Sequence, residues 1–135
     1  MRILLDTNIV IHREASSVVE PNIGVLFKWF DDLKYTKCVH SVTVNEINKH
    51  KDAQTVKAFN VKLESYTILK TVAPPSQIVT RTCSKIDKDE SDKNDTVLLN
   101  ELINNRADYL ITEDKTIVYK AALLGIRSEE HTSEL

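Results

Sequence analysis

Residues that interrupt secondary structure or form disulfides are scarce in this 135-residue sequence, which has two Gly, three Pro and two Cys. So little Gly and Pro excludes a collagen-like or Pro/Gly-rich disordered protein. Two cysteines are too few for a disulfide-stapled secreted domain, and Cys38 and Cys83 stand in neither a metal-binding nor a redox spacing. We therefore expect a reducing, cytoplasmic setting.

The chain also lacks an excess of one charge and a long apolar run. Its formal net charge of -2 argues against a protein that coats nucleic acid. It does not exclude a nuclease, because acidic metal ligands lower the net charge where the phosphate approaches. No stretch approaches the roughly 18 apolar residues that a membrane span needs, and Asp6 comes too early for a secretory signal. We expect no membrane partner.

The last nine residues, 127–135, read RSEEHTSEL. This segment is similar, residue for residue, to the translation of a widely used sequencing-library adapter; an ordinary polar tail is the alternative interpretation. On the adapter interpretation the natural chain continues past Ile126 with other residues. We therefore expect one domain over residues 1–126 and a non-native tail over 127–135, and we assign His131 no catalytic role.

Short apolar runs alternate with helical patterns in the rest of the chain. Four runs predict strands, at 3–5, 38–40, 66–69 and 109–111: the first is typical of a strand buried on both faces, the third alternates, and the fourth is also predicted to be buried. Apolar residues at helical spacing predict helices after Pro21-Asn22 and over 41–50, 52–63, 76–88, about 95–104 and 115–124, with a polar loop over 87–94. This alternation predicts an α/β fold, with a parallel sheet covered on both faces and ligands at the carboxyl ends of its strands.

Individual residues mark the expected helix ends and helix faces. We expect Ser41 and Asp52 to cap the helices that follow them, and Gly125 to stop the last helix. The apolar stripe that includes Trp29 and Phe30 is predicted to face the core. Exposure of Trp29 would instead indicate an interface.

Acidic residues fall where the expected strands end. Asp6 follows the first strand, and Asp114 lies three residues beyond the fourth, so both face the ligand edge of the sheet. Glu46 lies about one turn into the helix after the second strand and can lean over the same edge. Asp92 and Asp95 are three residues apart at the start of a helix, which places both carboxylates on one face.

Acids that converge from separate segments repel one another unless a cation lies among them. Hard carboxylate oxygens suit Mg²⁺ or Mn²⁺, and such ions bind a scissile phosphate and lower the pKa of a bound water. Each acid also has a structural interpretation. Asp6, Asp92 and Asp114 are possible caps or turn residues, and Glu46 alone reads as a solvated helix residue.

Taken together, these segments resemble a known nuclease family. Ile3-Leu4-Leu5-Asp6-Thr7-Asn8-Ile9 is similar to the opening of PIN-domain proteins, and Leu110-Ile111-Thr112-Glu113-Asp114 is similar to their late signature. Glu46 and Asp95 stand where the helix-borne Glu and the third acid of that family are expected. The order and spacing agree from Met1 to about Ile126.

The resemblance implies a three-layer α/β/α sandwich, with a parallel sheet of four to five strands whose last strand would begin where residues 127–135 start. It implies hydrolysis of RNA with Mg²⁺ or Mn²⁺. The catalytic and metal-binding residues would be Asp6, Glu46, Asp95 and Asp114. The stretch 71–94 is long and polar for a minimal member of the family.

Further roles and partners follow from the same resemblance. Asn8 and Thr112 would hold the carboxylates by hydrogen bonds, with Asp92 as an auxiliary acid. Lys49, Lys115 and Arg13 are candidate RNA contacts at the strand-end rim. The protein would be the toxin of a toxin–antitoxin pair, with an antitoxin protein as partner, or the nuclease module of a longer protein. A homodimer through the early helices is a further expectation.

Three other functions stay open at this point. A haloacid-dehalogenase-like phosphatase also starts with a strand-end Asp, but it usually has a second Asp two residues later, where this chain has Asn8. A receiver-like phosphoacceptor would use the acids near Asp6 and a late Lys, without needing Glu46 and Asp95 together. A degenerate PIN-like module would bind without catalysis.

Overall fold

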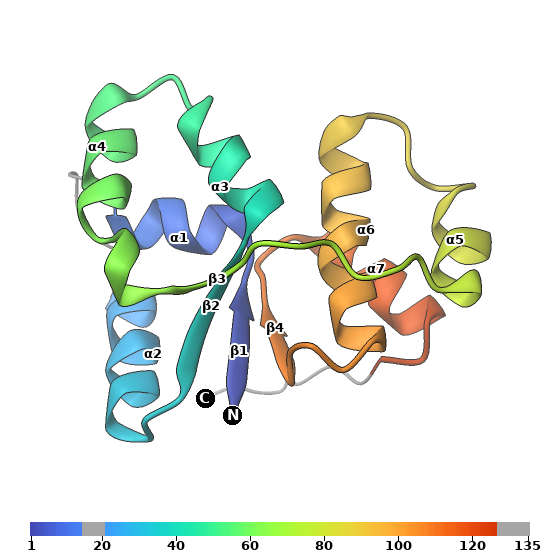
Figure 1. The fold of residues 1–135 in the computed structure, drawn as a ribbon, viewed down its shortest axis with the longest axis horizontal. Coiled ribbons are helices and arrows are strands. Elements are labelled where there is room, and N and C mark those ends of the chain that lie inside the picture. The colour runs from blue at the N-terminus through green and yellow to red at the C-terminus, as the bar shows by residue number, and fades with distance from the viewer. Residues whose placement is uncertain (15–20, 127–135) are drawn as a thin grey trace.

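The computed structural model describes residues 1–14 and 21–126, so the predicted tail lies outside the described residues. Four parallel strands form one sheet in the order β3-β2-β1-β4 (Figure 1). They are β1 (Arg2–Leu5), β2 (Thr36–His40), β3 (Thr67–Leu69) and β4 (Tyr109–Ile111). The four predicted strands are confirmed, but the predicted burial of 109–111 is wrong: β4 is the last strand of the order, with Tyr109 exposed and Leu110 and Ile111 half-buried.

Helices cover both faces of this sheet. In the described residues they are α1 (Thr7–Glu14), α2 (Pro21–Asp32), α3 (Ser41–Asn48), α4 (Ala53–Val61), α5 (Gln77–Cys83), α6 (Glu90–Ile103) and α7 (Lys115–Leu123), with a 3₁₀ turn η1 (Leu63–Ser65). Helices α1 to α4 lie on one side of the sheet and α5 to α7 on the other (Figure 1). The predicted three-layer α/β/α sandwich is confirmed. None of the helices in residues 1–14 and 21–126 is long and apolar enough to cross a membrane.

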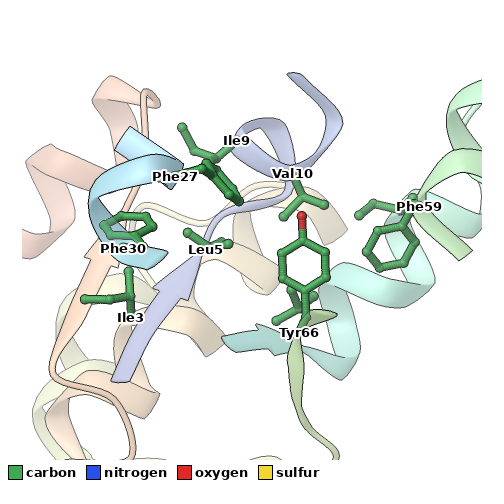
Figure 2. Packing of buried hydrophobic residues seen from close by; sticks show 10 residues of the cluster. Ile3, Leu5, Ile9, Val10, Phe27, Phe30, Phe59 and Tyr66 are labelled. Carbon is green, nitrogen blue, oxygen red and sulfur yellow. The ribbon is translucent and has the colours of Figure 1, made fainter. Parts of the chain in front are cut away.

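The apolar run of β1 is continuous because the strand is buried on both faces. Ile3 and Leu5 pack into the cluster under α1 to α4, beside Phe27 and Phe59 (Figure 2). Leu4 points the opposite way, into the cluster that α6 covers. A third apolar cluster joins α5, α6 and α7. The sheet edge that carries the acids therefore rests on a well-packed scaffold.

Helix α2 exposes part of its predicted core stripe. Phe30 is buried, but Val25, Trp29 and Leu33 are 50%, 58% and 58% exposed. These three residues are four positions apart and so share one helix face, which points away from the sheet. The predicted core position of Trp29 is therefore wrong.

Two predicted helix starts differ from the structure. His40, not Ser41, caps α3, because its Nδ1 accepts the backbone N–H of Val42 at 3.2 Å. Helix α6 starts at Glu90, so the predicted loop over 87–94 is wrong for residues 90–94. Asp89 accepts the N–H of Asp92 at 2.8 Å, which allows the polar stretch to form the first turn of the helix.

The other helix ends follow the prediction more closely. Asp52 caps α4 by accepting the N–H of Gln54 at 3.1 Å. Gly125 adopts a positive φ of 77° just beyond α7, as a glycine stop requires. Helix α5 ends at Cys83, five residues before the predicted end at residue 88.

Strands β1 and β4 are neighbours although they are the first and last strands in the described chain. From β1 the chain steps outward to β2 and β3, and it then returns to place β4 on the other side of β1. Ligands of open parallel sheets bind beyond the carboxyl ends of the strands at such a reversal. The backbone N–H of Asp6 donates to Ile111 at 3.0 Å across this junction.

Candidate active site

Asp6 is buried at the end of β1, and both of its carboxylate oxygens are held. Thr112, just beyond β4, donates its hydroxyl to Oδ2 at 2.8 Å. The backbone N–H of Thr7 donates to Oδ1 at 2.7 Å. The hydrogen bond that we expected from Thr112 to a site carboxylate is present, and its supporting role stays a prediction. A carboxylate fixed at both oxygens presents its remaining lone pairs in a defined direction.

Thr7 joins Glu46 to this junction. Its hydroxyl donates to Glu46 Oε1 at 2.8 Å, and it lies 3.3 Å from the hydroxyl of Thr43 in the same helix, α3. Thr7 therefore contacts Asp6 through its backbone and Glu46 through its side chain. We assigned Thr7 no role from the sequence. Its place directly after a strand-end acid is the sequence signal that could have identified it.

Asp114 caps α7, as its structural interpretation proposed. Its Oδ1 accepts the N–H groups of Thr116 at 2.8 Å and Ile117 at 3.4 Å, which leaves Oδ2 outside the cap. Its own N–H donates to the hydroxyl oxygen of Thr112 at 2.9 Å. Thr112 is therefore a direct link between Asp6 and Asp114. Asp114 can therefore cap α7 through Oδ1 and still lie near Asp6.

Asp95 lies buried on α6, and its surroundings raise its pKa to about 7. Burial is the largest cause, followed by the negative charges of Asp6, Asp114 and Glu46. Burial likewise raises the pKa of Asp6, against the hydrogen bonds from Thr112 and Thr7, and Asp114 and Glu46 raise it further. Four carboxylates from four separate segments therefore lie within range of one another's charge.

These acids have the donor atoms that a hard divalent cation prefers, but their side chains are not close enough together to coordinate one directly. Among the described residues, no three His, Cys, Asp or Glu side chains lie close enough together to hold a metal ion as they stand. The donors are nevertheless carboxylate oxygens, which Mg²⁺ and Mn²⁺ prefer. Burial is the main cause of the raised pKa values of Asp6 and Asp95, and the negative charges of neighbouring acids add to it; a cation would relieve that second cause. Binding through one or two carboxylates and several waters is the usual arrangement for Mg²⁺.

Three predicted site residues lie elsewhere. Asn8 is exposed on α1 and forms no hydrogen bond to Asp6, whose oxygens are held by Thr7 and Thr112. Asp92 accepts the N–H of Lys88 at 3.0 Å and so closes the turn before α6. Arg13 stacks its guanidinium 5.1 Å from the ring centre of Phe27, on the core side of α2. These contacts give Asp92 and Arg13 structural roles.

The two predicted lysines are placed differently. A cleft of about 390 Å³ beside Glu46 separates α3 from the first turns of α6, and its lining residues are Val42, Asn45, Glu46, Lys49, Glu90, Ser91 and Asn94. Lys49 thus stands at the rim of a cleft that reaches Glu46. Lys115 is exposed at the first turn of α7, next to Asp114. Both lysines can approach a phosphate at this edge.

A buried cation lies behind the acids. Lys120 of α7 is fully buried, with its Nζ 2.5 Å from Asp87 Oδ1 and 3.0 Å from the carbonyl oxygen of Asp92. It also donates to the hydroxyl of Thr96 at 3.1 Å, and its charge lowers the pKa of Asp95. The sequence gives no sign that Lys120 is buried, because a lysine in an amphipathic helix is normally exposed to solvent.

Comparisons with protein-family models, curated proteins and solved structures find no match to this chain. The resemblance to PIN-domain nucleases therefore stays a prediction. The geometry at the carboxyl ends of β1 and β4 is the observation on which a function can be argued.

Proposed function

We propose that this chain is a metal-dependent endoribonuclease of the PIN type, which hydrolyses RNA phosphodiester bonds with Mg²⁺ or Mn²⁺. One observation carries the proposal. Asp6, Glu46, Asp95 and Asp114 come from four segments; Thr112 links Asp6 to Asp114, Thr7 links Asp6 to Glu46, and charge among the four contributes to the raised pKa values of Asp6 and Asp95. Such clusters of perturbed acids are typical of functional sites.

Each acid has a distinct role in this proposal. Asp6, Asp95 and Asp114 would hold the cation, directly or through water, and Glu46 would bind or orient the attacking water. A bound divalent ion supplies positive charge to the scissile phosphate and lowers the pKa of that water. Thr112 orients Asp6 by its hydrogen bond, and Thr7 orients Glu46.

RNA is the proposed substrate, and the cleft between α3 and α6 is its proposed approach to Glu46. Lys49 at the rim and Lys115 beside Asp114 would contact phosphates, since both are exposed at this edge. An antitoxin protein is the proposed partner if the chain is a toxin. The exposed apolar face of α2 supports a homodimer.

A noncatalytic PIN-like binding module is the second candidate. It is favoured by the observation that no three acids in the described residues form a ready ligand group. The phosphatase alternative has less support, because that class usually has a second Asp two residues after the strand-end Asp, and this chain has an exposed Asn8 there.

Cleavage of mixed RNA with Mn²⁺, with and without a chelator, tests the proposal. We expect chelator-sensitive cleavage that leaves 5′-phosphate ends, because water attack assisted by metal produces them. Asp6→Asn is expected to lower cleavage at least about a hundredfold while the fold stays intact or becomes more stable, because carboxylate repulsion is relieved.

Asp32→Asn, the same chemical change on the exposed end of α2, is the matched control and should cleave normally. Wild-type protein that leaves RNA intact would favour the binding module. Normal cleavage by Asp6→Asn would remove Asp6 from the site.

A further inference from the structure

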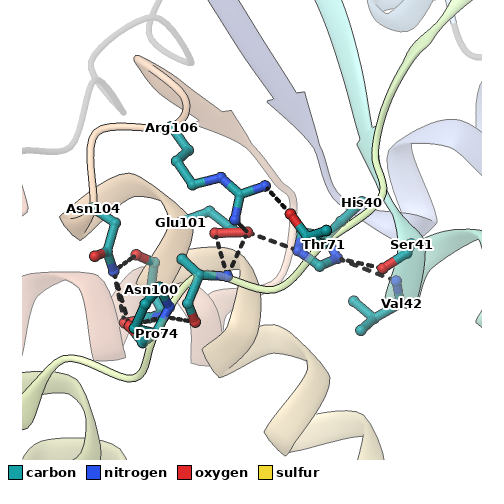
Figure 3. Close-up of polar contacts among 10 residues, drawn as sticks. His40, Ser41, Val42, Thr71, Pro74, Asn100, Glu101, Asn104 and Arg106 are labelled. Carbon is teal, nitrogen blue, oxygen red and sulfur yellow. Dashed lines mark hydrogen bonds and ion pairs between the residues drawn. The ribbon is translucent and has the colours of Figure 1, made fainter.

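A second set of buried polar groups includes His40 and Glu101 (Figure 3). His40 at the end of β2 and Glu101 on α6 are both 0% exposed, and His40 Nε2 lies 2.9 Å from Glu101 Oε1. Placing a carboxylate fully inside a protein is costly unless it is paired and hydrogen-bonded. The proposed nuclease chemistry uses neither residue.

The hydrogen bonds of His40 determine which ring nitrogen carries its proton. Nδ1 accepts the backbone N–H of Val42 at 3.2 Å, so it has no proton of its own. The proton is therefore on Nε2, which donates to Glu101. One ring orientation thus caps α3 at one nitrogen and contacts α6 at the other.

Glu101 is in turn held from several directions. The N–H of Ala73 donates to both of its oxygens at 3.2 Å, and Arg106 Nη1 lies 3.2 Å from Oε1. Arg106 also donates to the hydroxyl of Thr71 at 3.0 Å. Arg106 and Ala73 would therefore still balance the buried charge of Glu101 if His40 were replaced. Because these contacts hold Glu101 in place, its bond to His40 can fix the position of α3.

The two helices joined by this pair are the two that line the cleft. Glu46 lies on α3 six residues after His40, and Asp95 lies on α6 six residues before Glu101. The cleft beside Glu46 has walls from α3 and α6. A change in the spacing of these helices would therefore change the distance between Glu46 and Asp95.

We propose that His40 is a positioning residue, which through Glu101 fixes the separation of α3 and α6 and with it the spacing of Glu46 and Asp95. The consequence for metal binding rests on the proposed function. The spacing itself does not, and it can be measured in metal-free protein.

Two substitutions separate the two jobs of the ring. His40→Asn keeps an acceptor near the place of Nδ1 and so retains the α3 cap, but it cannot reach Glu101. His40→Gln keeps a donor near the place of Nε2 and so retains the link, but it loses the cap. His40→Ser is a second variant that is capped and unlinked, and it also covers the case in which His40→Asn fails to fold.

The spacing is read from spin labels at Asn45→Cys and Ser91→Cys, which lie exposed on opposite walls of the cleft, while the native Cys38 and Cys83 are buried. In metal-free protein we expect His40→Asn and His40→Ser to lengthen or broaden the distance between the labels, and His40→Gln to retain it. Calorimetry with Mn²⁺ on the unlabelled variants should show affinity about tenfold weaker for the unlinked variants and nearly unchanged for His40→Gln.

Unaltered label distances in both unlinked variants would overturn the proposal, as would the same distance change in His40→Gln. Either result would reduce the pair to a contribution to stability, which thermal unfolding of the same variants measures. If the distances change as expected but wild-type protein binds no Mn²⁺, the positioning role stands and the proposed nuclease function fails.

Discussion

At the scale of single residues, the protonation of Asp95 has the largest consequence. Its pKa rises from an ordinary 3.8 to about 7 because it is buried beside other acids. Between these values the folded state binds a proton that the unfolded state releases. The contribution of Asp95 to the stability of the metal-free protein is therefore most favourable at low pH. It becomes less favourable as the pH rises from about 3.8 toward 7.

We predict that metal-free protein melts at a higher temperature at pH 5.5 than at pH 8, by roughly 5 °C or more. At pH 8, Asp95→Asn should be more stable than wild type, because it has no charge to bury. Its melting temperature should also differ much less between pH 5.5 and pH 8 than that of wild type. Thermal unfolding in the presence of a chelator measures both effects. Asp32→Asn is the control, and an equal pH dependence in wild type and Asp95→Asn would contradict the assignment.

At the scale of elements, two sets of hydrogen bonds from buried side chains hold α6 in place. His40 and Glu101 attach its second half to the start of α3, and Lys120 attaches its first turns to α7. Asp95 lies between these two attachments along α6. A carboxylate surrounded by like charges needs such external constraints, because the acids by themselves would move apart.

We predict that Lys120→Met destabilises the protein by about 3 kcal/mol, because Asp87 is left buried without its cation. Lys120→Met combined with Asp87→Asn should recover a measurable part of that loss, since the unpaired charge is then gone. Urea unfolding of both variants gives the comparison. A double variant less stable than the single one would show that the pairing of charges is not the cause.

At the scale of the whole molecule, an exposed apolar stripe lies along α2 and the residue that follows it. Val25, Trp29 and Leu33 form one exposed stripe on the side of the helix that faces away from the sheet. Tryptophan is enriched where protein interfaces carry most of their binding energy. This stripe is the surface that we propose for the homodimer.

We predict that the wild-type chain sediments as a dimer and that Trp29→Lys sediments as a monomer, because a charge at the centre of an apolar contact has no partner. Lys28→Ala, also exposed on α2, should leave the dimer intact. Analytical ultracentrifugation decides between the two states. A monomeric wild-type protein would remove the proposed homodimer and leave the nuclease proposal untouched.

Much of the fold was predictable from the sequence, because it depends on local patterns. The continuous apolar run of β1 requires burial on both faces, and Gly125 can adopt the positive φ that ends α7. The hydrogen bond from Thr112 was expected only from the family resemblance, and Thr112 reaches Asp6 because β1 and β4 are neighbouring parallel strands.

The remaining features depended on tertiary structure, because helical spacing alone does not say which side of a helix meets a neighbour. The same periodicity fits Trp29 facing inward or outward, and it gives no sign that Lys120 is enclosed by α6 and the turn before it. The contacts of Thr7 with Glu46 and of His40 with Glu101 join residues 39 and 61 positions apart. Local propensity has no information about such distant pairs. The sequence alone therefore determined where the acids lie along the strands and helices, and packing determined which side chains hold them in place.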